Sequence, residues 1–200
     1  MKIAKIKIHY SLVFLLILSL FTGSFFKIFS IIICICLHEL SHYLFLKLFK
    51  VKVHKLELSI IGGILDIEEV DLPLIKKLII NASGICSNIL IIIFLKHLNI
   101  VSLNYLVSYN FCIIVFNLIP IIPLDGFRIL NDLLLSIYDD DYTFLLIKRI
   151  DIFCLIMLLI ILLLLRIYGL FLIWCFLLYK YFKYNIDDKK LKKLMYLLKK

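Results

Sequence analysis

The sequence His38-Glu39-Leu40-Ser41-His42 lies within an apolar run from Ile31 to Phe49. Residues four apart lie one above the other on an α-helix, so His38 and His42 present their imidazole nitrogens to one point. Two neutral imidazoles can supply half of a tetrahedral zinc site, at about 2.0–2.1 Å from the ion. Glu39 follows on the same helix, where its carboxylate can accept a proton from an attacking water.

This H-E-x-x-H pattern is typical of metalloprotease helices. The same pattern also arises by chance in helices that bind no metal. That alternative has to place three ionisable side chains in a segment of Ile, Leu and Cys. Ionisable groups at membrane depth are costly, and they mark functional sites by default. The pattern therefore predicts half of a metal site, and a third ligand must come from elsewhere in the chain.

The composition excludes an ordinary soluble domain. The 200 residues are 64% hydrophobic, and their mean hydropathy is +1.10. The net charge of +9 comes from side chains between and after the apolar runs, which indicates cytosolic flanks and not a nucleic-acid site. Six cysteines lie within the apolar segments without a C-x-x-C pair, so we expect neither disulfides nor a thiolate zinc site.

The apolar runs predict an all-α membrane protein with about six transmembrane helices, because a helical span needs roughly 20 apolar residues. The expected spans are His9–Phe26, Ile28–Leu48, Ile75–Leu95, Leu103–Ile119, Ile150–Leu165 and Leu170–Tyr181. The first run lacks a clear cleavage site, so we expect it to be retained. Residues 1–185 would form one membrane domain that carries the zinc site. Residues 186–200 would form a basic amphipathic cytosolic helix on an anionic leaflet.

A small β-hairpin is expected after the second span. Apolar and polar residues alternate between Val51 and Val70, and Gly62-Gly63 suggests a turn. A hairpin at membrane depth must lie against protein or line a wet cavity. Its edges can accept an extended peptide by strand addition. His54 in this hairpin is expected to be an exposed polar residue and not a ligand.

The positions of the basic residues predict the orientation in the membrane. With the N-terminus inside, 20 of the 23 Lys and Arg face the cytosol. The exceptions are Lys27, Lys96 and Arg166. We therefore expect both termini to be cytosolic. Spans two and four would then both run inward, which would bring His42 and Asp125 to similar depth.

Asp125 is the candidate third ligand. It follows a segment, Asn117-Leu-Ile-Pro-Ile-Ile-Pro-Leu-Asp125-Gly126, in which two prolines break the helix. Two histidines, an aspartate and a water make the open arrangement of a catalytic zinc, one per chain. Asn117, two helical turns before Asp125, can donate to a tetrahedral oxyanion. The alternatives are an Asp-Gly turn residue for Asp125 and a helix-packing hydrogen bond for Asn117.

These motifs resemble those of the site-2 family of intramembrane zinc proteases. The resemblance rests on His38–His42, the Gly-Gly hairpin, the stretch Ser83-Gly84 to Asn88, and Asn117–Gly126. The wording of residues 117–130 and the six-span layout are more narrowly similar to the stage IV sporulation protease branch. The resemblance implies zinc ligands at His38, His42 and Asp125, with Glu39 as the catalytic acid/base. It also implies that Asn117 is a polar group near the substrate carbonyl.

The same resemblance implies a protein substrate and a location. The substrate of that branch is the membrane-associated proform of sigma factor K, and partner membrane proteins hold the protease inactive. The location would be the bacterial cell membrane or the membrane around the forespore. Two departures are evident: Gly84 is followed by Ile85 where the family usually has proline, and a nucleotide-sensing domain is not expected after the basic tail.

Two other functions remain open from the sequence. A site-2 protease could cut an anti-sigma factor or a signal-peptide remnant instead of a pro-sigma factor. A membrane protein could also bind zinc for transport or structure without hydrolysis. A transporter would need polar residues along its pathway, and the fifth and sixth expected spans offer almost none.

Overall fold

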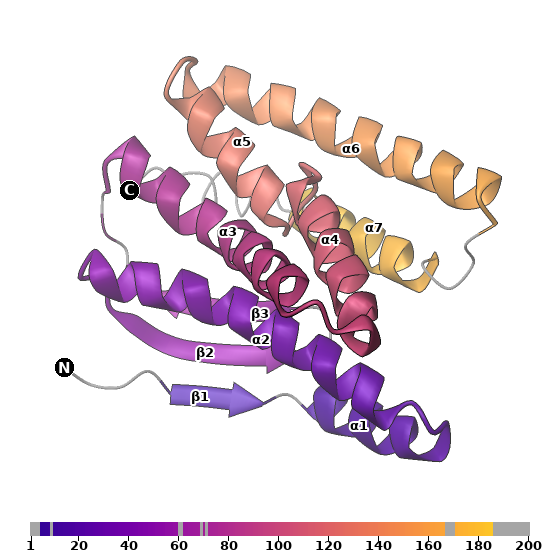
Figure 1. Cartoon of the computed structure of the whole chain (residues 1–200). Helices are drawn as coiled ribbons and strands as arrows, with labels where there is room; N and C mark the ends of the chain where they lie inside the picture. Colours follow the sequence, from indigo (N-terminus) through magenta and orange to yellow (C-terminus); the bar gives the residue numbers. More distant parts are fainter. Residues whose placement is uncertain are drawn as a thin grey trace. The chain divides into compact units, whose positions relative to one another are not determined.

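The computed structural model describes residues 5–8, 10–59, 62–68, 70, 72–166 and 171–185. The expected helix over 186–200 lies outside these residues. The chain divides into two compact units, residues 1–70 with 82–115 and residues 71–81 with 116–200. The described residues are mostly helical, with one small sheet, as the sequence predicts (Figure 1).

The first unit contains the sheet and the helix with the two histidines. Its elements are β1 (Lys5–Ile8), α1 (Tyr10–Phe21), α2 (Phe25–Leu48), β2 (Val53–Ser59), β3 (Gly62–Ile67), most of α3 (Leu74–Leu98), the 3₁₀ turn η1 (Val101–Leu103) and most of α4 (Asn104–Leu118). α2 packs against both β2 and β3, and α1 packs against the start of α2.

The sheet has three strands in the order β1-β2-β3. The expected hairpin is confirmed, since β2 and β3 pair antiparallel. The turn position is wrong, because Gly62 and Gly63 lie in β3, opposite Ser59 and Leu58. β1 pairs parallel with β2, although the sequence indicated only a short basic segment there. His54 is exposed, as expected.

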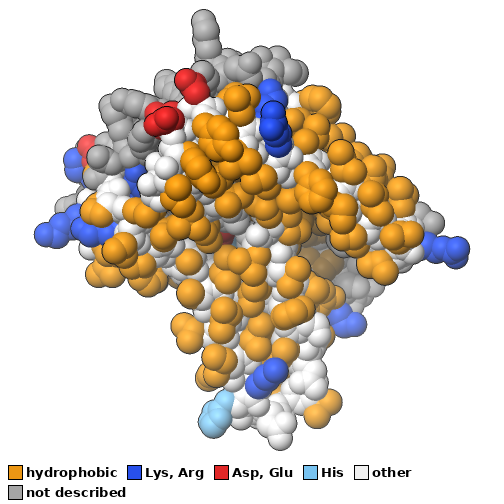
Figure 2. All heavy atoms as spheres, turned by 90° about the horizontal axis from the view of Figure 1, so that it is seen from above, with side chains coloured by type: hydrophobic (Ala, Val, Ile, Leu, Met, Phe, Trp, Pro, Cys, Tyr) orange, Lys and Arg blue, Asp and Glu red, His pale blue; other side chains and the backbone are white. Residues whose placement is uncertain are grey.

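α2 has two faces with an unusual distribution of polarity. The buried face carries Cys34, His38, Ser41, His42 and Leu46. The exposed face is mostly apolar, with Lys27 and Lys47 exposed only near the two ends of the helix. Its large apolar residues are Phe26, Phe29, Ile33, Leu37, Leu40, Leu44 and Leu48. In water this helix would expose its apolar face. In lipid the same distribution of side chains is favourable, because the polar side chains lie on the buried face. Hydrophobic side chains also predominate on the face drawn in Figure 2.

Three segments of the described chain are long and apolar enough to cross a membrane: α2, α3 and the segment Val101–Leu118. The expectation of six spans is thus supported at three positions.

α1 is a shorter apolar helix that ends before a turn at Gly23, whose φ of 67° favours glycine. α6 (Asp140–Leu164) has 25 residues, but its first half is charged. It begins ten residues before the expected span at Ile150.

The second unit contains α5 (Asp125–Leu135), α6 and α7 (Phe171–Asn185), together with the start of α3. α5 is a finding, because none of the helices expected from the sequence covers residues 125–135. Its buried Phe127 packs with Ile122, Phe144 and Ile147 in an apolar cluster. α7 packs on α6, and its Trp174 donates a hydrogen bond to the Leu155 carbonyl at 2.9 Å.

Gly126 allows the start of α5 to approach the end of α4 closely. A Cβ atom at this position would meet the carbonyl of Leu118 and would lie 2.8 Å from the carbonyl oxygen of Ile119. Both neighbours are backbone atoms, which cannot move aside as a flexible side chain does. Gly126 therefore fixes where Asp125 and α5 begin relative to Asn117 and the end of α4.

We expect Gly126→Ala to destabilise the protein by about 3 kcal/mol, because the added methyl group overpacks against backbone. Thermal unfolding of the purified protein in detergent measures this loss. Gly23→Asn is the matched control, since asparagine tolerates positive φ and a Cβ at Gly23 meets nothing within 4 Å. Equal melting temperatures for Gly126→Ala and the wild type would contradict the close approach.

Candidate metal centre

The two histidines of α2 converge as the sequence predicts. The Nε2 atoms of His38 and His42 are 3.3 Å apart, and both side chains are buried. Two nitrogens at 2.0–2.1 Å from one tetrahedral ion would be separated by about 3.3–3.4 Å. The observed distance therefore matches two ligands of a single metal. The rings lie edge to face, with an interplanar angle of 78°.

Ser83 of α3 contacts the outer nitrogen of one imidazole. Its Oγ lies 3.2 Å from Nδ1 of His42. When the proton is on Nδ1 and is donated to Ser83, the Nε2 lone pair is the one that can coordinate a metal. Such contacts fix the tautomer and ring orientation of metal-binding histidines. Sequence spacing gave no indication of this contact, because Ser83 and His42 lie 41 residues apart on different helices.

Gly84 leaves the space beside the two coordinating nitrogens empty. A Cβ atom at this position would lie 2.5 Å from Cε1 and Nε2 of His38, and closer still to Nε2 of His42. Any side chain there would occupy the point at which the two imidazoles converge. This contact joins residues of two helices, so the local spacing of the sequence gives no signal for it.

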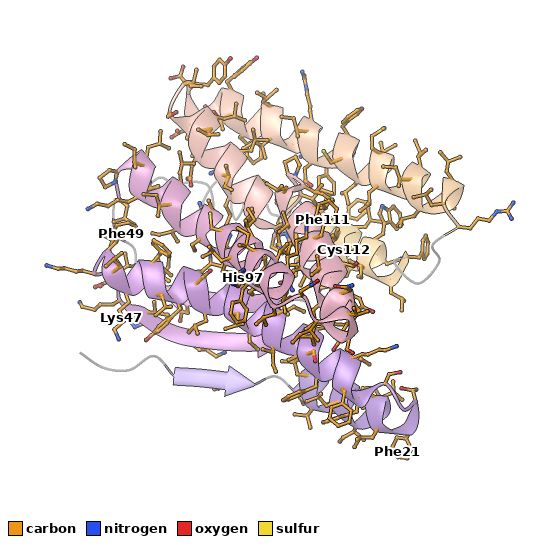
Figure 3. The ribbon with its side chains drawn as sticks, viewed as in Figure 1. Phe21, Lys47, Phe49, His97, Phe111 and Cys112 are labelled. Atoms are coloured by element: carbon orange, nitrogen blue, oxygen red, sulfur yellow. The ribbon has the colours of Figure 1, made fainter. Side chains whose placement is uncertain are left out.

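Glu39 lies beside His38 on α2 and is half-buried. Its position, next to the converging nitrogens but off the fully buried stripe, suits a carboxylate that is not a ligand. α2 continues past the histidines to its end at Leu48, where Lys47 and Phe49 mark the end of the helix (Figure 3). The first unit therefore brings together three of the five residues singled out from the sequence.

The other two residues, Asn117 and Asp125, belong to the second unit. Asn117 lies near the end of α4 and is half-buried, and Asp125 is the buried first residue of α5. A carboxylate in the first turn of a helix is stabilised by the helix dipole. The helix break between them is as expected, whereas α5 itself, which begins at Asp125, was not expected.

The residues of the first unit fit a zinc ion. The nitrogen spacing, the hydrogen bond to Nδ1 of His42 and the space kept open by Gly84 are the features that a bound metal requires. The described cysteines are all unpaired thiols. The donor set is imidazole, which suits zinc.

Comparisons with known proteins agree with this donor set. Residues 26–102 match the model of peptidase family M50, and that segment contains His38, Glu39, His42 and Gly84. A solved structure, a site-2 protease from Methanocaldococcus jannaschii, has a similar fold, with a TM-score of 0.69 and 24% identity over 92% of each chain. A comparison with curated proteins gives no match.

This similarity indicates a multi-pass membrane protein and a metalloendopeptidase of the site-2 type, with a zinc cofactor and a protein substrate. This confirms the metalloprotease class that the H-E-x-x-H pattern indicated. It disfavours a zinc-binding transporter or a purely structural zinc protein.

We expect Gly84→Ala to abolish zinc retention, because the methyl group would fill the position at which the two imidazoles converge. Alanine also raises helix propensity by about 1 kcal/mol over glycine, so a weaker α3 would not explain the loss. Metal analysis of the purified variant measures the effect. Cys86→Ala, an exposed change two residues further along α3, is the control. Full zinc occupancy in Gly84→Ala would contradict the position inferred for the metal.

Ser83→Ala should weaken zinc binding without abolishing it, because the two ligands remain while His42 loses its orienting contact. Losses of this kind are about 10–100-fold in affinity. Competition with a chromophoric chelator measures the change. Ser83→Thr, which keeps the hydroxyl, should retain most of the affinity. An unchanged affinity in Ser83→Ala would show that the contact does not orient the ring.

Proposed function

We propose that this protein hydrolyses a peptide bond in a membrane-tethered regulatory protein, and that it activates a sporulation pro-sigma factor. The observation that carries the proposal is the pair of imidazole nitrogens 3.3 Å apart on a helix whose exposed face is apolar. A hydrolytic centre on such a helix lies at membrane depth. Its substrates are therefore proteins whose cleavage site lies in or beside the bilayer.

In this proposal His38, His42 and Asp125 hold one zinc ion, and the fourth position is left to water. The choice of Asp125 is supported by its chemistry, because a carboxylate completes the open three-ligand set of a catalytic zinc. It is supported further by the position of Asp125 at the start of α5, directly after the two prolines that interrupt the helix. Such an ion supplies Lewis-acid polarisation of the carbonyl and a more acidic water.

Glu39 then acts as the general base and acid. Its carboxylate accepts a proton from the attacking water and returns it to the nitrogen of the leaving amine. Asn117 donates its amide N–H to the carbonyl oxygen as negative charge develops there. The half-buried positions of both side chains support these roles, because each must contact a substrate that enters and leaves.

The choice of substrate rests on the sequence of residues 117–130, which resembles that of the stage IV sporulation protease branch. The substrate would be the proform of sigma factor K, and partner membrane proteins would restrain the protease. The orientation with both termini in the cytosol follows from the distribution of Lys and Arg. It would place α2 and α4 with their C-terminal ends toward the cytosol, the compartment of a sigma factor.

The test is cleavage of co-expressed pro-sigma factor K by the wild type and by Glu39→Gln. Glutamine has the size of glutamate but cannot accept the proton, so we expect cleavage to fall by about 10²–10⁴-fold. Zinc content should remain equal in the two proteins, since Glu39 is not a ligand.

Two outcomes would contradict parts of the proposal. Equal cleavage by both proteins would show that Glu39 is not the base. Zinc-loaded wild type that leaves pro-sigma factor K intact would overturn the sporulation substrate while leaving the metalloendopeptidase class untouched.

A further inference from the structure

The orientation of α5 has to be imposed from outside the helix. α5 has 11 residues, and isolated helices of this length are marginal in stability. Leu124 stands at its N-cap, where it has no polar side chain to hold the first turn. On one flank, Phe127 and Leu134 pack with Phe144 and Ile147 of α6. These apolar contacts hold one flank of α5 on α6, and a directional contact on another part of the helix would restrict its rotation further.

A second contact ties α5 to α3 within the same unit. Asn81 Nδ2 donates a hydrogen bond of 2.7 Å to Oδ2 of Asp132. The two residues are 51 positions apart in the sequence, and only 7% and 4% of their surfaces are exposed. A short, buried bond to a carboxylate is stronger and more directional than an apolar contact. It therefore restricts the rotation of α5 about its axis.

Asp132 shares a face of α5 with Asp125. Seven residues separate them, which is close to two full turns, so both side chains leave the helix in nearly the same direction. The separation along the axis is about 10.5 Å. Asp132 is therefore too far along the helix to share a metal ion with Asp125. Rotation of α5 would nevertheless displace both carboxylates together.

We propose that the Asn81–Asp132 hydrogen bond is a positioning contact that fixes the rotation of α5 and so aims Asp125 at the metal. This inference deepens the proposed function, because it rests on Asp125 as the third zinc ligand. Asn81 and Asp132 act through Asp125 and touch neither metal nor substrate. Without the bond, α5 keeps its apolar packing on α6 and its first residue loses its fixed direction.

Two opposing effects act on the pKa of the buried Asp132 carboxyl group. Burial raises the pKa of Asp132 to about 7, against the opposing influence of Lys77, Arg128 and the bond from Asn81. Lys77 is one turn before Asn81 on α3, and Arg128 is one turn before Asp132 on α5. From α6, the buried side chains of this region are Thr143, Phe144 and Ile147, none of which titrates.

The experiment compares zinc retention and cleavage in variants of the full-length protein. Asn81→Ala and Asp132→Ala each remove the bond, and we expect about a tenfold loss of zinc affinity in chelator competition. Asp132→Asn keeps an acceptor oxygen and should stay near the wild type. Asp139→Asn, an exposed acidic residue after α5, controls for the loss of a negative charge.

A reversed pair supplies the rescue. Asn81→Asp alone places two carboxylates face to face and should lose zinc most severely. Asn81→Asp combined with Asp132→Asn restores one donor opposite one acceptor, and it should recover most of the zinc affinity. Cleavage should fall through kcat more than through KM in the alanine variants, because the substrate contacts remain.

Two results would overturn the inference: unchanged zinc affinity in both alanine variants, or no recovery in the reversed pair when its melting temperature equals that of the wild type. Failure of the proposed function is distinguishable. In that case Asp125→Ala itself would retain zinc, whatever the Asn81 and Asp132 variants do.

The pKa of Asp132 adds a prediction about stability. Its ordinary value of 3.8 applies to the unfolded chain, so between pH 4 and 7 the folded protein holds a proton that the unfolded chain releases. This contribution to stability is complete below pH 4 and is lost as the pH rises through about 7. We expect the melting temperature of the wild type, relative to Asp132→Asn, to fall between about pH 4 and 7 and to level off above that range. A difference that does not change with pH would contradict it.

Discussion

The structure depends on one constraint. The Nε2 atoms of His38 and His42 must come within 3.3 Å of each other on the buried face of a helix that is apolar enough to cross a membrane. Because of this requirement, the polar face of α2 is buried and its apolar face is exposed, the reverse of a helix in a soluble protein. It also dictates the neighbour. α3 must come close enough for Ser83 to contact His42. It must also lack a side chain at Gly84, because any side chain there would fill the metal position. The buried face of α2 and the residues Ser83 and Gly84 of α3 are explained by this one requirement.

α3 supplies residues to two separate tasks within four positions. Ser83 and Gly84 serve the histidines of the first unit, and Asn81 holds Asp132 of α5 in the second. Small side chains explain how α3 can approach its neighbours so closely. The sequence shows Asn81-Ala-Ser-Gly84 simply as a weakly polar stretch in an apolar span. Its meaning lies in the partners that the fold brings to it.

What the sequence could predict was local. His38 and His42 were predictable because i,i+4 spacing alone brings them together. The hairpin was predictable from the alternation of apolar and polar residues, whereas Gly62-Gly63 gave the wrong turn position. β1 was missed because four residues, Lys5 to Ile8, become a strand only by pairing with β2 some 50 positions later. α5 was missed because it is short and directly follows two prolines, which break the preceding helix. The roles of Gly84 and Asn81 depend on contacts between helices, which no spacing rule contains.

The most direct test of the metal centre is X-ray absorption at the zinc edge of the purified, zinc-loaded protein. The account predicts one zinc per chain with two imidazole nitrogens and the remaining oxygen donors at about 2.0–2.1 Å, and it predicts that His42→Ala removes one imidazole. Sulfur scatterers at about 2.3 Å would instead mean that cysteines bind the metal. That result would contradict the assignment of the His38–His42 pair as the centre of the site.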